Sequence, residues 1–356
     1  MAPLPPFSLS YLIGRPMRLI KVLLFILILI TSSGAARPAP PELKVNVHSS
    51  FRFVAFGDTR FTDPADTKAA NPAVRKAIVA AIAEEKPAFI SIGGDIVHDG
   101  SAEKDWDDYD RETAIWRFNH IPVFPALGNH DLHGSLSVCL PNYFKRYPDL
   151  KGNRFYAVRA GSVLVLTLDS SLEELSGPQG DWVKSQLNSV PANVAFVVIV
   201  LHHPPYTSSS NAKEFGGGHS ARIEEQVLAM FLENRQKRLK ARIVVISGHV
   251  HNYERHEHGG LIYFVTGGGG DHAYPIPRNP DDPFQSHEIN YHYLRVDVDG
   301  GRMRVTMRRL EPTNSGITWT EPDAVTITDQ RRHETGEVQD SRNQQSKPES
   351  ARAFRR

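Results

Sequence analysis

The chain has 356 residues, 40% of them hydrophobic, enough to bury one large core or two modest ones. Its 41 Lys and Arg residues nearly balance its 40 Asp and Glu residues, so the net charge gives no sign of a polyanionic partner such as a nucleic acid. The single cysteine, Cys139, excludes an intramolecular disulfide, and its apolar neighbours favour a small buried residue over a nucleophile.

Residues 1–36 have the pattern of a secretory signal. Three basic residues precede an apolar run at 22–30, and small residues follow it up to Ala36. The run is well short of the ~20 residues that span a bilayer, so we expect cleavage and export to the periplasm or the exterior. The alternative is an uncleaved membrane anchor.

The remaining chain is expected to consist of three parts. Residues 37–48 begin with a proline-rich stretch and are predicted to be a linker. Residues 49–315 contain the periodic apolar runs and are predicted to form the functional domain. Residues 329–356 have almost no apolar side chains and are predicted to be a disordered tail.

Strands and helices alternate along the predicted domain. Apolar runs predict strands at 51–56, 88–92, 121–125, 163–168, 194–201, 243–246 and 261–266. Helical spacing predicts helices at 71–82, 103–118, 180–187 and 220–240, the last with Ile223, Val227, Leu228, Phe231 and Leu232 on its inner face. Apolar runs at 293–298 and 303–307 predict a final pair of antiparallel strands. This order indicates an α/β layered domain, but periodicity does not distinguish a doubly wound sheet from a sandwich.

Five short segments carry most of the side chains that can bind metals, and each follows an apolar run. They are Gly57–Arg60, Gly94–His98, Gly128–Asp131, His202–Tyr206 and Gly248–His251. Because α/β enzymes place their sites at the carboxyl ends of strands, we expect these segments to meet at one edge of a sheet. Their Asp, Asn and His side chains are suitable ligands for two metal ions.

In this order the five segments resemble the calcineurin-like metallophosphoesterase superfamily, and residues 248–255 (GHVHNYER) are similar to purple acid phosphatases in particular. The resemblance covers about 51–309. It implies a four-layer α-β-β-α sandwich of two mixed sheets and a pair of divalent or trivalent ions (Fe, Mn or Zn). It also implies hydrolysis of phosphate monoesters by a hydroxide that bridges the two ions.

The resemblance also implies the ligands. Asp95 bridges the two ions, Asp58 and His251 bind the first ion, and the second ion is bound by Asn129, His202 and His249. Taken alone, Asp95 would equally suit a turn residue that caps a helix.

Three further residues lie next to these ligands. The resemblance gives His130 a catalytic role, as general acid or transition-state stabiliser in contact with substrate. We predict that Asp131 fixes the tautomer of His130 and raises its pKa, with helix capping as the alternative. The His-x-Pro-x-Tyr spacing assigns the ligand role to His202, so His203 is expected to face substrate or solvent.

Two positions depart from the family pattern. Arg60 stands where many members have histidine, and His98 stands where purple acid phosphatases have tyrosine. We hypothesise that His98 completes the first metal site, which predicts a protein without the purple phenolate-to-Fe(III) band. Arg60 suits bidentate binding of phosphate, or equally a surface salt bridge to Asp63 or Asp66.

Two other motifs receive structural interpretations. Gly267–Gly270 lacks the lysine and the spacing of a Walker motif, so we expect its backbone to pass close beneath the metal site. Arg255 is expected to pair with Glu254 or another nearby carboxylate.

The sequence therefore predicts an exported metal-dependent phosphatase whose partner is a small phosphate ester. Nothing indicates nucleic-acid binding, and membrane contact is limited to the signal segment unless that segment is retained. Two alternatives stay open: a phosphodiesterase or nucleotide hydrolase at the same site, and a non-catalytic binding protein that keeps the fold.

Overall fold

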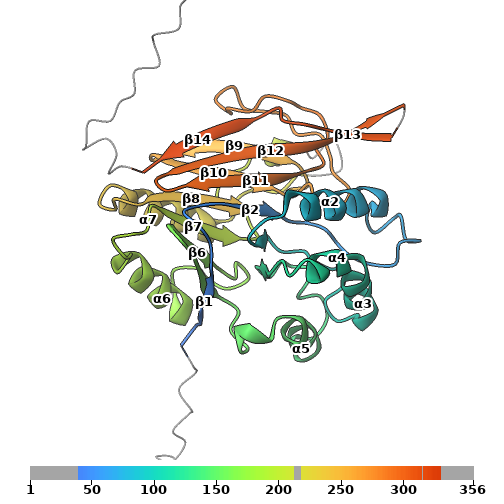
Figure 1. The fold of residues 1–356 in the computed structure, drawn as a ribbon, viewed down its shortest axis with the longest axis horizontal. Coiled ribbons are helices and arrows are strands. Elements are labelled where there is room, and N and C mark those ends of the chain that lie inside the picture. The colour runs from blue at the N-terminus through green and yellow to red at the C-terminus, as the bar shows by residue number, and fades with distance from the viewer. Residues whose placement is uncertain (1–38, 212–217, 315, 330–356) are drawn as a thin grey trace, which may run out of the picture. The chain divides into compact units, whose positions relative to one another are not determined.

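Two mixed β-sheets face each other in this protein (Figure 1). The computed structural model describes residues 39–211, 218–314 and 316–329. The predicted signal segment and nearly all of the predicted tail lie outside these ranges. No helix within them is long and apolar enough to cross a membrane.

The first sheet has seven strands in the order β1-β5-β6-β7-β8-β10-β9. Their bounds are β1 Glu42–Val45, β5 Tyr156–Ala160, β6 Val163–Thr167, β7 Phe196–Leu201, β8 Arg242–Ser247, β10 Leu261–Thr266 and β9 Tyr253–His258. Strands β6, β7, β8 and β10 run parallel, whereas β5 and β9 lie antiparallel to β6 and β10. The parallel strands therefore end at one common edge.

The second sheet has the order β13-β12-β11-β2-β3-β4, and β14 also pairs with β12. Its strands are β13 Gly316–Thr320, β12 Arg302–Thr313, β11 His292–Asp299, β2 Ser50–Phe56, β3 Ile90–Ile92, β4 Val123–Pro125 and β14 Ala324–Thr328. Strands β2, β3 and β4 are parallel, and the predicted final pair of antiparallel strands is confirmed by β11 and β12.

Two predicted domain boundaries need correction. The predicted linker contains β1, which pairs in parallel with β5, and the second sheet continues past residue 315 through β14. Strand β1 has only half-buried and exposed positions, so its sequence lacks the strong apolar run of a central strand.

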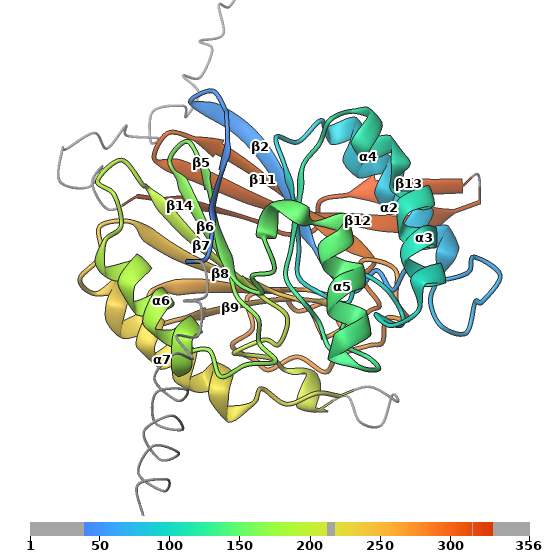
Figure 2. The ribbon, with the colours of Figure 1, turned by 90° about the horizontal axis from the view of Figure 1, so that it is seen from below.

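Helices cover the outer side of both sheets (Figure 2). Helices α6 (Gly177–Asn188) and α7 (Ile223–Gln236) lie beside the first sheet. On the other side are α2 (Pro72–Glu85), α3 (Glu103–Glu112), α4 (Ala114–Phe118) and α5 (Leu136–Arg146). Cys139 in α5 is buried and free, as predicted. Within the described ranges, the remaining short helices are the 3-10 turns Pro148–Leu150 and Ser209–Asn211.

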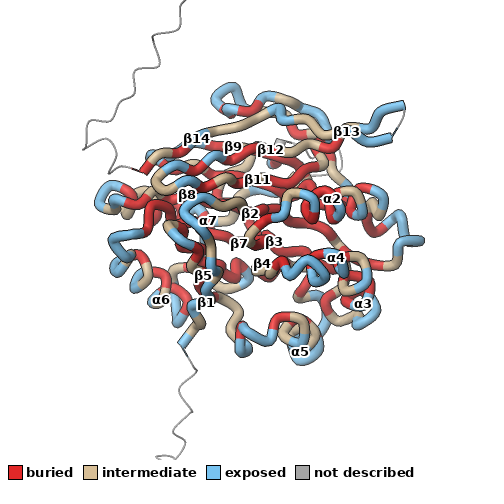
Figure 3. Tube along the Cα trace, viewed as in Figure 1, coloured by how far each residue is buried: buried red, intermediate tan, exposed pale blue. Residues whose placement is uncertain are grey.

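Strand β7 shows why the central strands are apolar throughout. Val198 and Val200 point into the core shared by the two sheets, whereas Val197 and Ile199 pack in the cluster that includes Leu228 of α7. A strand covered on both faces has no position for a polar side chain, and central strands such as β7 and β8 lie in the buried interior of Figure 3. The predicted four-layer sandwich of two mixed sheets is confirmed.

The predicted inner face of α7 was partly wrong. Leu228 and Leu232, one helical turn apart, are fully buried. Ile223 and Val227 are 74% and 48% exposed. The helix buries only a narrow stripe, and neighbouring positions are rotated about 100° away from it.

Candidate metal centre

The predicted ligands lie at the carboxyl ends of strands from both sheets. Asp58 follows β2, Asp95 follows β3 and Asn129 follows β4 in the second sheet; His202 and His249 follow β7 and β8 in the first. Backbone hydrogen bonds join these ends, including Gly57 N–H to Thr266 O (2.8 Å), which links β2 to β10. The edges at which the parallel strands of the two sheets end thus meet at one site.

The backbone around this site is strained. Asp58, Arg60, Asp95 and His249 all have positive φ, between 43° and 69°. For residues with a Cβ this left-handed conformation costs energy, and it persists only where the surroundings enforce it. Here it turns the chain directly after each strand, so that the following side chains enter the site.

The glycine run after β10 lies beneath the site, as predicted. A Cβ on Gly267 would stand 2.1 Å from the carbonyl oxygen of Val250 and 2.9 Å from Asp58 Oδ2. Only a residue without a side chain permits this close approach.

His202 lies at the centre of one group of donor atoms. Its Nδ1 is 2.9 Å from the carbonyl oxygen of Gly93, which can only accept, so this nitrogen carries the proton. The Nε2 of the neutral ring then presents a lone pair 3.0 Å from Asn129 Oδ1, 3.2 Å from His249 Nδ1 and 3.4 Å from Asp95 Oδ1.

These spacings fit a bound metal. Ligand atoms 2.0–2.1 Å from one ion stand about 3.0–3.4 Å from each other, depending on the geometry. We call the group of Asp95, Asn129, His202 and His249 the second metal site. Its members are those that the sequence predicted.

Another group of candidate ligand atoms surrounds His251. Its Nε2 lies 3.7 Å from Asp58 Oδ1 and 3.2 Å from Oδ2 of Asp271, an acid that the sequence analysis missed. We call Asp58, Asp95 and His251 the first metal site. The carboxylates of Asp58 and Asp95 and a ring nitrogen of His202 also lie within 4.8 Å of one another, so the two sites adjoin.

Arg60 points into this group rather than to the surface. Its Nη2 is 3.6 Å from Asp95 Oδ2 and its Nε is 2.5 Å from Asp271 Oδ2. Asp63, one surface partner considered for it, is paired with Lys104 instead. The guanidinium is thus placed where an anion bound at the metal site would meet it.

Burial shifts the protonation of this site. Burial, followed by Asp95 and Asp271, raises the pKa of Asp58 well above its usual value. Burial would also raise the pKa of Asp95, but nearby His202, His130 and Arg60 lower it overall. Burial and then Arg60 lower the pKa of His251 to about 3. Neutral imidazoles beside crowded carboxylates are the state that a cation requires of its ligands.

A family model described as calcineurin-like phosphoesterase matches residues 51–253. This match spans more than half of the 356 residues. The chain belongs to the calcineurin-like phosphoesterase family. Every predicted metal ligand lies within the matched range, whereas Asp271 lies beyond it.

Curated relatives include purple acid phosphatases. Purple acid phosphatase 22 of Arabidopsis thaliana is 26% identical over 247 residues, which cover 62% of this chain and 54% of that protein. Phosphoenolpyruvate phosphatase of Allium cepa is 27% identical over 186 residues, covering 48% and 36%. The chain therefore spans about half or less of the length of these relatives.

Solved structures support the fold. Purple acid phosphatase PPD1 from yellow lupin superposes with a TM-score of 0.61 at 18% identity, covering 80% of this chain and 55% of that one. A structure of PhoD gives 0.55 at 15% identity, covering 82% and 72%. At these identities the likeness establishes the shared architecture alone.

His130 lies against the carboxylate of Asp95. Its backbone N–H donates to Asp95 Oδ1 (2.8 Å), and its Nδ1 lies 2.7 Å from the carbonyl oxygen of His98. That carbonyl fixes the proton on Nδ1 and leaves Nε2 to exchange a proton. Burial lowers the pKa of His130 to about 4, against the opposing effect of Asp95.

The predicted role of Asp131 is wrong in the structure. Its carboxylate accepts backbone N–H bonds from Ile96 (2.9 Å), Val97 (3.2 Å) and Gly128 (2.8 Å), and the tautomer of His130 is set by His98 instead. Asp131 does not cap a helix either. Because its side chain turns back towards β3 and β4, it joins the two loops that carry Asp95 and Asn129. Burial and then Asp95 raise its pKa to about 8.

His98 is packed beside His130, with 5.5 Å between ring centroids. Its Nδ1 is buried and has no hydrogen-bond partner among the described residues. In that part of the chain the structure gives it no contact with Asp58 or His251. Its role as a metal ligand stays a prediction.

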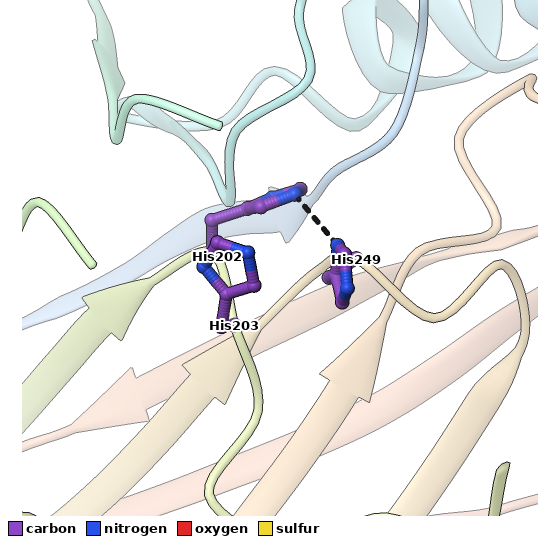
Figure 4. Close-up of side chains that lie close together, drawn as sticks. All are labelled: His202, His203 and His249. Carbon is purple, nitrogen blue, oxygen red and sulfur yellow. Dashed lines mark hydrogen bonds between the residues drawn. The ribbon is translucent and has the colours of Figure 1, made fainter. Parts of the chain in front are cut away.

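His203 lies beside the second metal site, as Figure 4 shows with His202 and His249. A ring nitrogen from each of the three lies within 4.8 Å of the others. His203 Nδ1 is 2.8 Å from Ser170 Oγ, and burial, followed by His202, lowers its pKa to about 2. His219, which the sequence analysis did not assign, packs against His249 with 4.3 Å between the ring centroids.

Arg255 has the structural role that was predicted. It pairs with Asp323 (2.8 Å) and Glu257 (2.5 Å), away from the metal ligands. Its predicted neighbour Glu254 instead accepts from Ser208 N–H and Thr207.

Proposed function

We propose that this chain is an exported metal-dependent phosphatase that hydrolyses small phosphate monoesters. The observation that carries the proposal is the position of His202 Nε2, which has three donor atoms at 3.0–3.4 Å, the spacing expected around one ion. Bound ions would supply positive charge to phosphoryl oxygens and lower the pKa of water.

The chain's own groups account for substrate binding and proton transfer. Arg60 places a fork of N–H donors beside Asp95, suited to a phosphoryl oxygen pair. In its imidazolium form, His130 carries on Nε2 the proton that the leaving-group oxygen takes up, while Nδ1–H stays bonded to His98 O. The names of the curated relatives, purple acid phosphatases and a phosphoenolpyruvate phosphatase, support a monoester substrate.

A paired assay tests this function. The metal-free protein is loaded with Mn²⁺, Fe or Zn²⁺, its metal content is measured, and turnover of p-nitrophenyl phosphate is compared with that of the bis-ester across pH. We expect faster turnover of the monoester. His130→Ala should lower kcat by about 10²–10⁴-fold, and the control His48→Ala, an exposed histidine in another part of the fold, should not.

Other outcomes would redirect the proposal. Preference for the bis-ester would make the chain a phosphodiesterase with the same centre. Failure to bind any metal, with no turnover, would favour a non-catalytic binding protein.

Export is tested separately. Residues 1–36 carry the basic and apolar pattern of a signal. Expression of the full chain in a secreting host, followed by mass spectrometry of the product, should give a mature N-terminus near Arg37. Retention of the intact N-terminus in the membrane fraction would contradict export.

A further inference from the structure

Asp271 lies at the first metal site although no predicted motif contains it. It follows β10 and the glycine run, and it is 2% exposed. Its N–H donates to the carbonyl oxygen of Asp58 (2.9 Å), and its Oδ1 accepts from the N–H of His272 (2.6 Å). These bonds fix the carboxylate so that Oδ2 is the atom that faces His251.

The contact between Asp271 and His251 joins two acceptor atoms. His251 Nδ1 lies 3.1 Å from the carbonyl oxygen of His272, so the ring proton sits on Nδ1. In the neutral ring Nε2 then carries a lone pair, 3.2 Å from Asp271 Oδ2. Two lone pairs at this distance repel unless a proton or a metal cation lies between them, and the distance matches that between two ligands of one ion.

Arg60 forms an ion pair with Asp271 Oδ2 but no hydrogen bond to it. Arg60 Nε is only 2.5 Å away, yet neither atom forms a hydrogen bond among the described residues because their geometry is unfavourable. Asp95 Oδ2 is likewise buried without a hydrogen bond in the described part. With Asp58, three buried carboxylates face one guanidinium, which leaves a net charge suited to a further cation.

We propose that Asp271 is a protein ligand of the first metal site, together with Asp58, Asp95 and His251. It fills the position that the sequence analysis assigned to His98, and its ion is a hard or borderline metal such as Mn²⁺ or Zn²⁺. The proposal rests on the proposed function, because it presumes that the chain binds a metal pair.

Metal stoichiometry tests the proposal without using activity. The full chain is stripped with a chelator, loaded with Mn²⁺, desalted and analysed by plasma mass spectrometry, and the affinity of each ion is measured by calorimetry. We expect two ions in the unaltered protein and one in Asp271→Asn. The matched control Asp281→Asn, an exposed acid on the same segment, should keep two.

Two further variants separate a ligand from a partner of Arg60. If Asp271 binds metal, Arg60→Met keeps two ions, with at most the 10–100-fold weakening that follows loss of a group bonded to a ligand. In Asp271→Asn the affinity for the first ion should fall by more than 100-fold. Equal losses in both variants, two tightly bound ions in Asp271→Asn, or loss of the first ion in His98→Ala alone would overturn the assignment.

Hydrogen exchange of the unaltered protein gives a further test, which does not depend on whether a variant folds. Addition of Mn²⁺ should slow exchange in peptides that contain Asp271 and His272 to the same extent as in those that contain Asp58. Unchanged exchange at Asp271, with protection at Asp58, would overturn the ligand assignment alone. Absence of any bound metal in the unaltered protein would overturn the proposed function as well.

Discussion

Replacement of Asp131 should destabilise the protein through the backbone rather than through His130. The carboxylate is fully buried and accepts three buried N–H groups, from Ile96, Val97 and Gly128. These donors belong to the two loops that follow β3 and β4. Without Asp131 they have no described acceptor at this point, so the loops that hold Asp95 and Asn129 should separate.

Asparagine and alanine at position 131 should lower the free energy of unfolding by different amounts. Asparagine keeps an oxygen for Ile96 and Val97 but turns an amide N–H₂ towards the N–H of Gly128, which costs about 1–3 kcal/mol for one unsatisfied donor. Alanine removes all three acceptor contacts, so we expect a loss of at least about 3 kcal/mol. That is a large part of the 5–15 kcal/mol that stabilises a typical domain.

Chemical denaturation of the metal-free protein measures both losses. Asp281→Ala, which changes an exposed acid, is the control and should lie within about 0.5 kcal/mol of the unaltered protein. If the proposed activity holds, Asp131→Asn should leave the pH dependence of kcat of the metal-loaded protein unchanged, because His98 sets the tautomer of His130.

Either of two results would refute this reasoning. The first is unfolding of Asp131→Ala at the same denaturant concentration as the control, which would show that the three bonds contribute nothing net. The second is a shift of the acid limb of the pH profile in Asp131→Asn at constant stability. That result would restore Asp131 as the partner of His130.

Three other predictions concern the surroundings of the site. Gly267→Ala should abolish metal binding and lower the melting temperature, because its Cβ would stand 2.1 Å from Val250 O; metal content equal to that of the unaltered protein would contradict this. Burial lowers the pKa of His256, but its bonds to Asp282 and Glu254 outweigh burial and raise it to about 9. Its stabilising effect, at most on the order of 3 kcal/mol, is therefore complete below pH 6.5 and lost as the pH rises through about 9, so His256→Gln should cost more at pH 6 than at pH 10 in denaturant unfolding. Leu228→Ala should lower the free energy of unfolding by about 2–5 kcal/mol and Ile223→Ala by less than about 0.5 kcal/mol. Thermal melting measures both losses, and similar losses would mean that α7 packs by its predicted face.

Local patterns were sufficient to predict the central strands and which polar side chains gather at their ends. Val194–Leu201 is apolar because both faces of β7 are covered, and that composition is visible in the chain itself. Asp58, Asp95, Asn129, His202 and His249 each follow such a run, and parallel strands end at a common edge. Position along the chain therefore predicted which side chains would meet.

Asp271 shows where the same rule could have been carried further. It follows the predicted strand 261–266, so its place at a strand end was visible, but four glycines separate it from β10. Its distance to His251 depends on the path of those glycines beneath Asp58. No periodicity encodes that path.

The sequence by itself determined the family, the layered class and the residue types of the candidate metal ligands, because these depend on residue type and on short spacings. Only the tertiary structure decided what each polar group faces. Asp131 and His130 are adjacent in the chain, yet their side chains bind different backbone groups. Arg60 is near Asp63 in sequence but pairs with Asp271, because contacts between loops are made by the packing of two sheets and not by proximity along the chain.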